Sequence, residues 1–314
     1  MTDAYQSLRS AAAFLDLSER GKIRVTSEDR ARLVHAMSTN QIQQLQTDSG
    51  VYAFFLTALG RILADAYIFN LGDSLFLDTE PELGAKLYAH LDKYLIADDA
   101  ELHDETAQWA VLGIEGPESY LRATSLAIPV PEAPLALKAY NSGFVARVAG
   151  TQPNGLRIFI PPAEKAALLE RFADSGLPQA SSEDGNIVRL ENGIPRYGQD
   201  ITERYLVQET EAMHAVHPNK GCYLGQEIVE RVRSRAQVHR YLRSVRIASS
   251  EAPAPGTKLQ ADGKDVAEIT SAAYSPALGE VVALAYVRTE ATLSKPVLVV
   301  AGTQSPQAAR LAVG

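Results

Sequence analysis

Residues 220–227 read Lys-Gly-Cys-Tyr-Leu-Gly-Gln-Glu and contain the only cysteine, Cys222, of a chain of 314 residues. Gly221 and Gly225 flank this cysteine, and glycine permits the tight or left-handed backbone that a sharp turn needs. Lys220 and the N-terminus of the helix expected to follow would both favour a thiolate at Cys222. A cysteine in such a turn can equally pack as a small apolar residue, so the local pattern leaves both interpretations open.

The composition of the chain is that of a soluble globular protein. Hydrophobic residues make up 46% and charged residues 22% of the sequence. No apolar run approaches the ~18 residues of a membrane span, and the N-terminus lacks the features of a signal peptide. We therefore expect a cytoplasmic protein of about two or three domains without membrane contact. A single cysteine forms no intrachain disulfide and cannot supply the four thiolates that usually hold an iron–sulfur cluster.

The charge of the chain is uneven. The formal net charge is −8, which argues against general affinity for nucleic acid. Residues 231–246 nevertheless contain six arginines, one histidine and no acid: Arg231, Arg233, Arg235, His239, Arg240, Arg243 and Arg246. Such a segment is usually a solvated face. It can also be an anion site, because guanidinium groups fit carboxylates and phosphates.

Apolar periodicity and turn residues predict the elements of the chain. The expected strands of the first half are 22–26, 51–57, 61–69, 74–78, 144–149 and 156–160. The expected helices begin near Ser27, Pro81, Pro117 and Ala163, and the last of them stops at Gly176. After about residue 235 the pattern is β-rich without a helix, over 239–248, 257–260, 266–272, 280–287 and 296–301. This last region predicts a separate small antiparallel barrel.

Two carboxylates stand out as candidate site residues. Asp65 is an acid inside an otherwise apolar strand, so it is either exposed at a sheet edge or directed into a cavity. Glu191 lies in a segment, 189–195, that we expect to run from a strand into a turn. A carboxylate there can accept hydrogen bonds within the turn, or it can pair with a guanidine-like edge such as that of a pterin.

Other kinds of site have little support in the sequence. His214 and His217 have a spacing that can serve a metal on a helix, but Pro218 follows and no third ligand is near. Glycine-rich phosphate loops and the nucleophile elbow of serine hydrolases are absent. We therefore expect no metal site and no nucleotide or hydrolase chemistry.

Over nearly its whole length the chain resembles the YgfZ-type folate-binding proteins, relatives of the glycine-cleavage T-protein (aminomethyltransferase). The most specific match is Lys-Gly-Cys-Tyr-x-Gly-Gln-Glu at 220–227. Supporting matches are Asp29-Arg30 with Ser38-Thr39-Asn40, residues 60–69, and residues 189–198. The resemblance implies an α+β fold in which three domains form a ring around a folate cavity, with a C-terminal antiparallel β-barrel. The implied domains are 1–48 plus 105–235, an α+β folate-binding unit; 49–104, an inserted β-rich unit; and 236–314, the barrel.

The resemblance also implies roles for individual residues. Glu191 would grip the pterin, and Asp65 would lie beside the N10 region of the folate. The other expected folate-binding residues are Arg189, Lys220, Tyr223 and Arg235, and Cys222 is expected to be a functional thiol. The chain departs from the T-protein in two places. Asp78 stands where the T-protein has an asparagine, and residues 150–154 replace its Tyr-Thr-Gly-Glu segment.

The function that the resemblance implies is binding of tetrahydrofolate, or of a one-carbon derivative, in support of iron–sulfur cluster synthesis or maintenance in client proteins. The two departures favour a binding protein over an enzyme. One alternative is a folate-dependent aminomethyltransferase, and the other is a tRNA-associated or nucleic-acid-associated module that uses the arginines of 231–246. If Arg231, Arg233, Arg235 and Arg240 face the cavity mouth, we expect the folate to be polyglutamylated.

Overall fold

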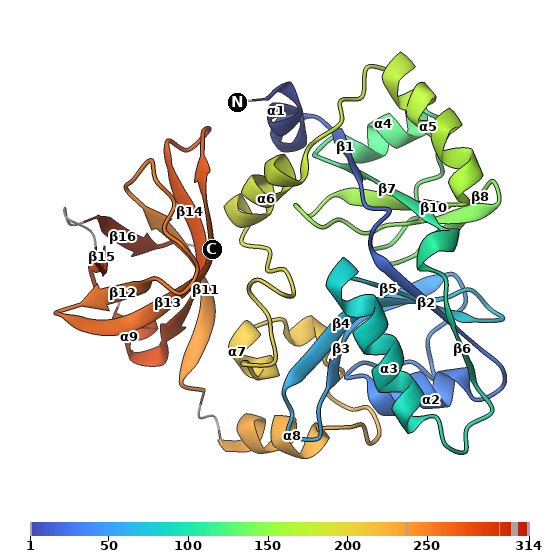
Figure 1. Cartoon of the computed structure of the whole chain (residues 1–314), viewed down its shortest axis with the longest axis horizontal. Helices are drawn as coiled ribbons and strands as arrows, with labels where there is room; N and C mark the ends of the chain where they lie inside the picture. The colour runs from blue at the N-terminus through green and yellow to red at the C-terminus, as the bar shows by residue number, and fades with distance from the viewer. Residues whose placement is uncertain (1, 236–237, 295, 303–306, 313–314) are drawn as a thin grey trace.

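The computed structural model describes residues 2–235, 238–294, 296–302 and 307–312, and it contains two five-stranded sheets and a closed barrel (Figure 1). The expected α+β fold with a C-terminal antiparallel β-barrel is confirmed. None of the described helices is long and apolar enough to cross a membrane.

The first sheet has the strand order β1-β7-β10-β9-β8, and its paired strands are antiparallel. Its strands are β1 (Ala13–Asp16), β7 (Ala110–Glu115), β8 (Leu137–Tyr140), β9 (Gly143–Ala146) and β10 (Gly155–Ile160). The helices around it are α1 (Asp3–Ser10), α4 (Ser119–Ser125), α5 (Pro162–Asp174) and α6 (Ser182–Glu191). Apolar residues of α4 and α5, such as Ala123 and Phe172, share one core with this sheet. Burial of these faces drives the packing.

The second sheet has the strand order β3-β4-β5-β2-β6. Its strands are β2 (Gly21–Thr26), β3 (Ser49–Leu56), β4 (Ile62–Asn70), β5 (Leu75–Thr79) and β6 (Glu101–Asp104). The helices α2 (Arg30–Met37) and α3 (Gly84–Tyr94) contribute to its core, as do residues of the later segment that carries α7 (Val207–Thr210) and α8 (Gln226–Arg235).

An aromatic cluster joins the two sheets. Phe76 of β5 meets Phe144 of β9 and Phe159 of β10, each with its ring centroid at 5.5 Å. Phe144 and Phe159 stack on each other at 4.6 Å. Edge-to-face and stacked aromatic contacts stabilise packing beyond the burial of apolar area. The cluster therefore fixes the two sheets against each other.

The barrel closes through the strand order β11-β14-β13-β12-β15-β16, with β16 pairing back onto β11. Its elements are β11 (Arg240–Ile247), β12 (Lys258–Ala261), β13 (Lys264–Ser275), β14 (Glu280–Arg288), α9 (Thr289–Ser294), β15 (Leu298–Val300) and β16 (Ala308–Leu311). Sequence periodicity predicts five of these strands but misses β16. The expectation of no helix here is wrong, because α9 follows β14. Both missed elements are short, with four residues in β16 and six in α9.

Except for the segment 189–195, the other predicted elements agree with the structure within a few residues. Pro81 is the first residue of a short 3-10 helix, η1 (Pro81–Leu83), and Gly176, at φ 70°, follows α5. Pro117 lies farther out than predicted, because Glu118 is the N-cap of α4.

The predicted boundary at residue 48 does not match the sheets. The sequence assigns residues 1–48 to the first unit and 49–104 to the second. In the structure β2 pairs with β5 and β6, and α2 packs in the core of the second sheet. The second sheet therefore takes residues from both sides of residue 48. The remainder of the division, with 105–235 in the first unit and 236–314 in the barrel, stays a prediction.

Candidate functional site

A cavity of about 610 Å³ lies between the two sheets. Its walls come from β1, β4, β7, β10, α6 and the segment 194–199, and its lining residues all precede residue 200. The barrel therefore contributes none of the lining. Ligand-binding pockets commonly measure roughly 300–1,000 Å³, so the cavity can hold a cofactor-sized molecule.

Asp65 lies in this cavity, on an interior strand of the second sheet. Its side chain is buried, with 8% of the residue exposed. Of the two structural alternatives that the sequence allows, the structure shows the cavity position. The hydroxyl of Tyr52 donates to Asp65 Oδ2 at 2.6 Å, and no arginine or lysine pairs with Asp65 among the described residues. Burial and then the charge of Glu80 raise the pKa of Asp65 to about 6. Asp65 can therefore exchange a proton close to neutral pH.

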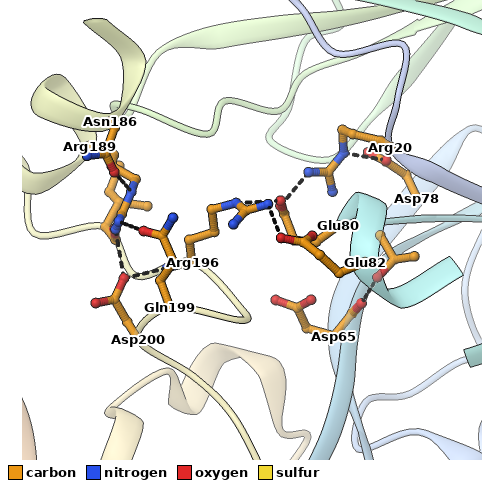
Figure 2. Close-up of polar contacts among 12 residues, drawn as sticks. Arg20, Asp65, Asp78, Glu80, Glu82, Asn186, Arg189, Arg196, Gln199 and Asp200 are labelled. Atoms are coloured by element: carbon orange, nitrogen blue, oxygen red, sulfur yellow. Dashed lines mark hydrogen bonds and ion pairs between the residues drawn. The ribbon is translucent and has the colours of Figure 1, made fainter. Parts of the chain in front are cut away.

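A chain of charged groups forms the wall beside Asp65 (Figure 2). Arg20 Nε donates to Asp78 Oδ1 at 2.6 Å, and Arg157 Nη1 donates to Asp78 Oδ2 at 2.5 Å. Arg20 also pairs with Glu80, which accepts from Arg196 Nε at 2.9 Å. Asp78 is fully buried, and a buried charge is tolerated only with such partners.

Arg189 of α6 lines the opposite part of the cavity and is tied to the barrel. Its Nη1 donates to Asp200 Oδ2 at 2.7 Å. The other carboxylate oxygen of Asp200 accepts from Thr270 and Ser271 of β13, each at 2.5 Å. The expected position of Arg189 at the site is thus in agreement with the structure. The guanidinium of Arg189, however, is already bonded to protein groups. Figure 2 shows Asn186, Gln199 and Asp200 around it.

The predicted role of Glu191 does not fit its position. Glu191 is the last residue of α6 and does not lie in a strand-to-turn segment. It does not line the cavity. Its carboxylate accepts from Arg9 Nε at 2.7 Å, and from Tyr5 and Ser275 at 2.5 Å each. These partners come from α1 and β13, so Glu191 joins the N-terminal helix to the barrel. A pterin would have to displace all three donors, and we do not retain Glu191 as its ligand.

Lys220 and Tyr223 also lie outside the cavity lining. Lys220 Nζ donates to the carbonyl oxygens of His35 at 2.6 Å and Ser38 at 2.5 Å, at the C-terminal end of α2. The ring of Tyr223 lies 4.9 Å from Nζ. Burial lowers the pKa of Lys220 to about 7 and raises the pKa of Tyr223 to about 12. Both residues fasten the loop to α2, and their predicted role in binding folate is not supported.

Cys222 is exposed in this loop. Gly225 has φ 82°, as the sequence predicts for a left-handed turn, whereas Gly221 has no positive φ. A Cβ at Gly225 would lie 2.6 Å from the carbonyl oxygen of Thr57, so only glycine allows the β3–β4 turn to approach. Lys220 donates to α2 and makes no hydrogen bond to the thiol, so the structure gives no support to its expected effect on Cys222.

Glutamates outside the segment 231–246 pair with several of its arginines. Arg231 pairs with Glu227 at 2.5 Å, Arg233 with Glu230 at 3.4 Å, and Arg240 with Glu209 at 2.7 Å. Arg231, Arg233 and Arg240 are not among the residues that line the cavity, so the condition under which a polyglutamylated folate is expected has no support from the lining. The side chain of Arg235 lies outside the described residues. Because their glutamate partners offset these positive charges, the nucleic-acid alternative loses the observation on which it rested.

Several residues of the cavity wall were not predicted from the sequence: Arg20, Tyr52, Glu80, Arg157 and Arg196. Arg157 gives the same signal as Asp65, since it is a charged residue within an apolar strand. The other four stand at ordinary surface or strand positions, and nothing local distinguishes them.

His214 and His217, the pair whose spacing could serve a metal, belong to no metal-binding cluster among the described residues. Within the described part of the chain, no three His, Cys, Asp or Glu side chains are grouped so that they could hold a metal ion.

Comparison with known proteins places this architecture in one class, in which an α+β region is followed by a small β-barrel. Residues 1–220 match the model described as the GCVT N-terminal domain, and residues 240–311 match the glycine cleavage T-protein C-terminal barrel domain. The chain therefore belongs to the glycine cleavage T-protein family.

Similar proteins support this assignment. An aminomethyltransferase of Rubrobacter xylanophilus is 27% identical, over 91% of this chain and 78% of the relative. An aminomethyltransferase of Thermus thermophilus is 26% identical, over 91% of this chain and 82% of the relative. The crystal structure of glycine cleavage system aminomethyltransferase T from Bartonella henselae superposes with a TM-score of 0.91 at 18% identity, covering 99% of this chain and 87% of that one. This last likeness establishes the fold.

Proposed function

We propose that this chain is a YgfZ-type member of the T-protein family that binds tetrahydrofolate, or a one-carbon derivative of it, in the cavity between the sheets. The observation that carries the proposal is Asp65, a buried carboxyl group that lines the cavity and pairs with no cation among the residues that the structure describes. Reduced folates carry N–H donors on the pterin and at N10, and these need acceptors that protein groups have not already taken.

The remaining cavity wall suits such a ligand. Tyr52, Tyr67 and Tyr197 line the cavity and provide aromatic surface beside which a pterin could pack. Bound folate would supply a carrier for a one-carbon unit. Asp65, with its pKa near 6, can accept or return a proton at the ligand near neutral pH.

The test of folate binding is calorimetric titration with tetrahydrofolate and with its 5-formyl and methylene forms. Asp65→Asn should weaken binding roughly tenfold or more, because the amide cannot supply the second acceptor and leaves a donor of the ligand unpaired. Asp73→Asn, the same change at an exposed position in the β4–β5 turn, is the matched control and should bind like the wild type. Equal affinity of the Asp65→Asn protein and the control would reject the assignment.

We further propose that folate binding serves iron–sulfur cluster synthesis or maintenance in client enzymes, with Cys222 as the contacting thiol. Cys222 is exposed and lies outside the cavity lining, where a partner protein can reach it. A thiolate can ligate iron or exchange sulfur. Asp78 and residues 150–154, where the chain departs from the T-protein, argue against aminomethyl transfer.

The test of this role is complementation of a deletion strain. Cys222→Ser should fail to restore iron–sulfur enzyme activities under oxidative stress, although the purified variant binds tetrahydrofolate normally. Full restoration by Cys222→Ser would remove the thiol from the function.

A second candidate is a folate-dependent aminomethyltransferase, which is favoured by the names of the relatives and by the acid at Asp65. It predicts release of ammonia when the protein is mixed with an aminomethyl-loaded lipoyl carrier protein and tetrahydrofolate. Tetrahydrofolate binding without ammonia release supports the binding protein. Catalytic release of ammonia that is lost in Asp65→Asn would establish the transferase.

A further inference from the structure

Glu80 lies between two guanidinium groups of the cavity wall (Figure 2). Its Oε1 accepts from Arg20 Nη1, and its Oε2 accepts from Arg196 Nε at 2.9 Å. Only 18% of its side chain is exposed. Burial by itself would raise the pKa of Glu80, but Arg20 and Arg196 outweigh burial and hold it at about 2. Glu80 is therefore ionised at neutral pH.

The two arginines come from separate parts of the chain and meet only at Glu80. Arg20 precedes β2, and Arg196 follows α6. Each arginine has a further acid of its own, since Arg20 pairs with Asp78 at 2.6 Å and Arg196 pairs with Glu82 at 2.7 Å. Within the described residues, Glu80 is the one carboxylate that bonds both.

Asp65 lies beside this arrangement without joining it. The titratable groups that bear on Asp65 are Tyr52 of β3, Tyr67 of β4, Tyr197 of the segment 194–199, Arg20, and Glu80 after β5. Arg20 is the cation among them, and its positive charge acts on Asp65. Its guanidinium nevertheless bonds Asp78 and Glu80.

We propose that Glu80 is a positioning residue, which keeps Arg20 and Arg196 bonded to itself and so leaves Asp65 without an ion pair in the cavity wall. The physical reason is competition between carboxylates. An arginine near two buried carboxylates bonds the one that offers the better geometry, and an ion-paired carboxylate loses its capacity to take up a proton near neutral pH.

The replacement Glu80→Gln removes the charged acceptor while keeping the size of the side chain. Arg20 then loses one of its two acids, and its positive charge, which already acts on Asp65, is no longer offset by Glu80. The like charge that opposes ionisation of Asp65 also disappears. Both changes stabilise the Asp65 carboxylate, so both lower its pKa.

The inference is tested by carbon NMR titration of the Asp65 carboxyl group in the full-length protein without ligand. In wild type we expect a titration midpoint of about 6. In Glu80→Gln we expect it to fall toward the ordinary aspartate value of about 4. Glu80→Asp, which keeps the charge, should retain a midpoint near that of wild type. A wild-type midpoint in a folded Glu80→Gln protein would overturn the inference.

Glu82→Gln is the matched control. It makes the same chemical change two positions away and removes one contact of Arg196, but Glu82 contacts neither Arg20 nor Asp65. The midpoint of Asp65 should not move in this variant. If Glu82→Gln lowers it as much as Glu80→Gln does, loss of any nearby charge is sufficient and the positioning role is refuted.

A second variant covers the case in which Glu80→Gln does not fold. The double replacement Glu80→Gln with Arg196→Gln removes one acid and one base and keeps the net charge of the wall. Arg20 is still released from Glu80, so the midpoint of Asp65 should fall as in the single variant. An unchanged midpoint in the folded double variant would again overturn the inference.

The role of Glu80 rests on the proposed function only in that an Asp65 without an ion pair would then serve a bound folate. Because the titration uses protein without folate, a lowered midpoint in Glu80→Gln supports the role of Glu80 even if tetrahydrofolate does not bind. Conversely, weakened tetrahydrofolate binding by Asp65→Asn with an unmoved midpoint in Glu80→Gln supports the folate site and rejects the role of Glu80.

Discussion

The cavity between the sheets and the loop at residues 220–227 differ in which of their polar groups are paired. In the cavity, Arg20 and the other three arginines of the wall have acid partners, whereas Asp65 pairs with no cation in the described part of the chain. In the loop, the cation of Lys220 is buried against carbonyl groups, and the thiol of Cys222 faces solvent. The cavity is therefore suited to a small ligand with hydrogen-bond donors, whereas the loop is suited to contact with another macromolecule.

This contrast shows why charge in the sequence is a poor guide to a binding site. The arginine-rich segment 231–246 contains no acid, which suggests an anion site. In the structure, however, Glu209, Glu227 and Glu230 offset the charges of three of its arginines. The arginines that do line the cavity are scattered from Arg20 to Arg196. Asp65 differs in that no cation pairs with it among the described residues, and such pairing is known only after folding.

The largest effect is expected from breaking the buried ion pairs of the cavity. Asp78→Asn leaves Arg157 without its carboxylate, in a position where 3% of the side chain is exposed. Loss of one partner of a buried pair typically costs about 3–5 kcal/mol of unfolding free energy. Denaturant unfolding measures this loss. Glu82→Gln, which breaks an exposed pair, should cost less than about 1 kcal/mol, and equal losses would contradict the contrast.

Asp65→Asn should stabilise the protein in a pH-dependent way. The pKa of Asp65 is about 6 in the native state, above the value of about 4 expected in the unfolded chain. Between these values the unfolded state loses its proton first, so the stability of wild type falls as pH rises from about 4 to 6 and is then level. Two pKa units correspond to about 2–3 kcal/mol.

The asparagine variant cannot ionise and should escape that loss. We expect it to be more stable than wild type at pH 8 by up to about 2–3 kcal/mol, and nearly equal to it at pH 4. Denaturant unfolding at the two pH values measures the difference. A stability difference that does not change with pH would show that Asp65 ionises normally.

The two glycines of the loop should respond differently to alanine. Gly225 has φ 82° and its Cβ would clash with the Thr57 carbonyl at 2.6 Å, so Gly225→Ala should cost about 1–3 kcal/mol. Gly221 has room, with His35 Nε2 at 3.6 Å from its Cβ, so Gly221→Ala should change stability by less than about 0.5 kcal/mol. Thermal unfolding of the pair provides the comparison. Similar losses would mean that the close approach of the β3–β4 turn is not what requires glycine.

The smallest effect on the isolated protein is expected at Cys222. Cys222→Ser should leave stability within about 0.5 kcal/mol of wild type, because the side chain is exposed. Wild-type protein should react with iodoacetamide under native conditions, because the thiol is exposed. A thiol that reacts only after unfolding would mean that the loop hides the sulfur. The cellular effect of the replacement would then need another explanation.

Local rules determined many of the elements and one residue of the site. Asp65 stands out as an acid within an otherwise apolar strand, β4, and turn residues such as Pro81 and Gly176 lie where helices begin and end. Apolar runs and turn residues also predicted five of the six described strands of the barrel. These features depend on residues a few positions apart, which the sequence shows directly.

Tertiary structure alone decided which charged groups are paired. Glu191 appeared free to bind a ligand until folding brought Arg9, Tyr5 and Ser275 to its carboxylate. Lys220 was expected beside a thiol or a folate and instead caps α2. Glu80 gave no signal at all. The physical reason is that a side chain's direction follows from the local backbone. Its hydrogen-bond partners come from segments far away along the chain, so the whole fold decides that Asp65 bonds Tyr52 and, within the described residues, no cation.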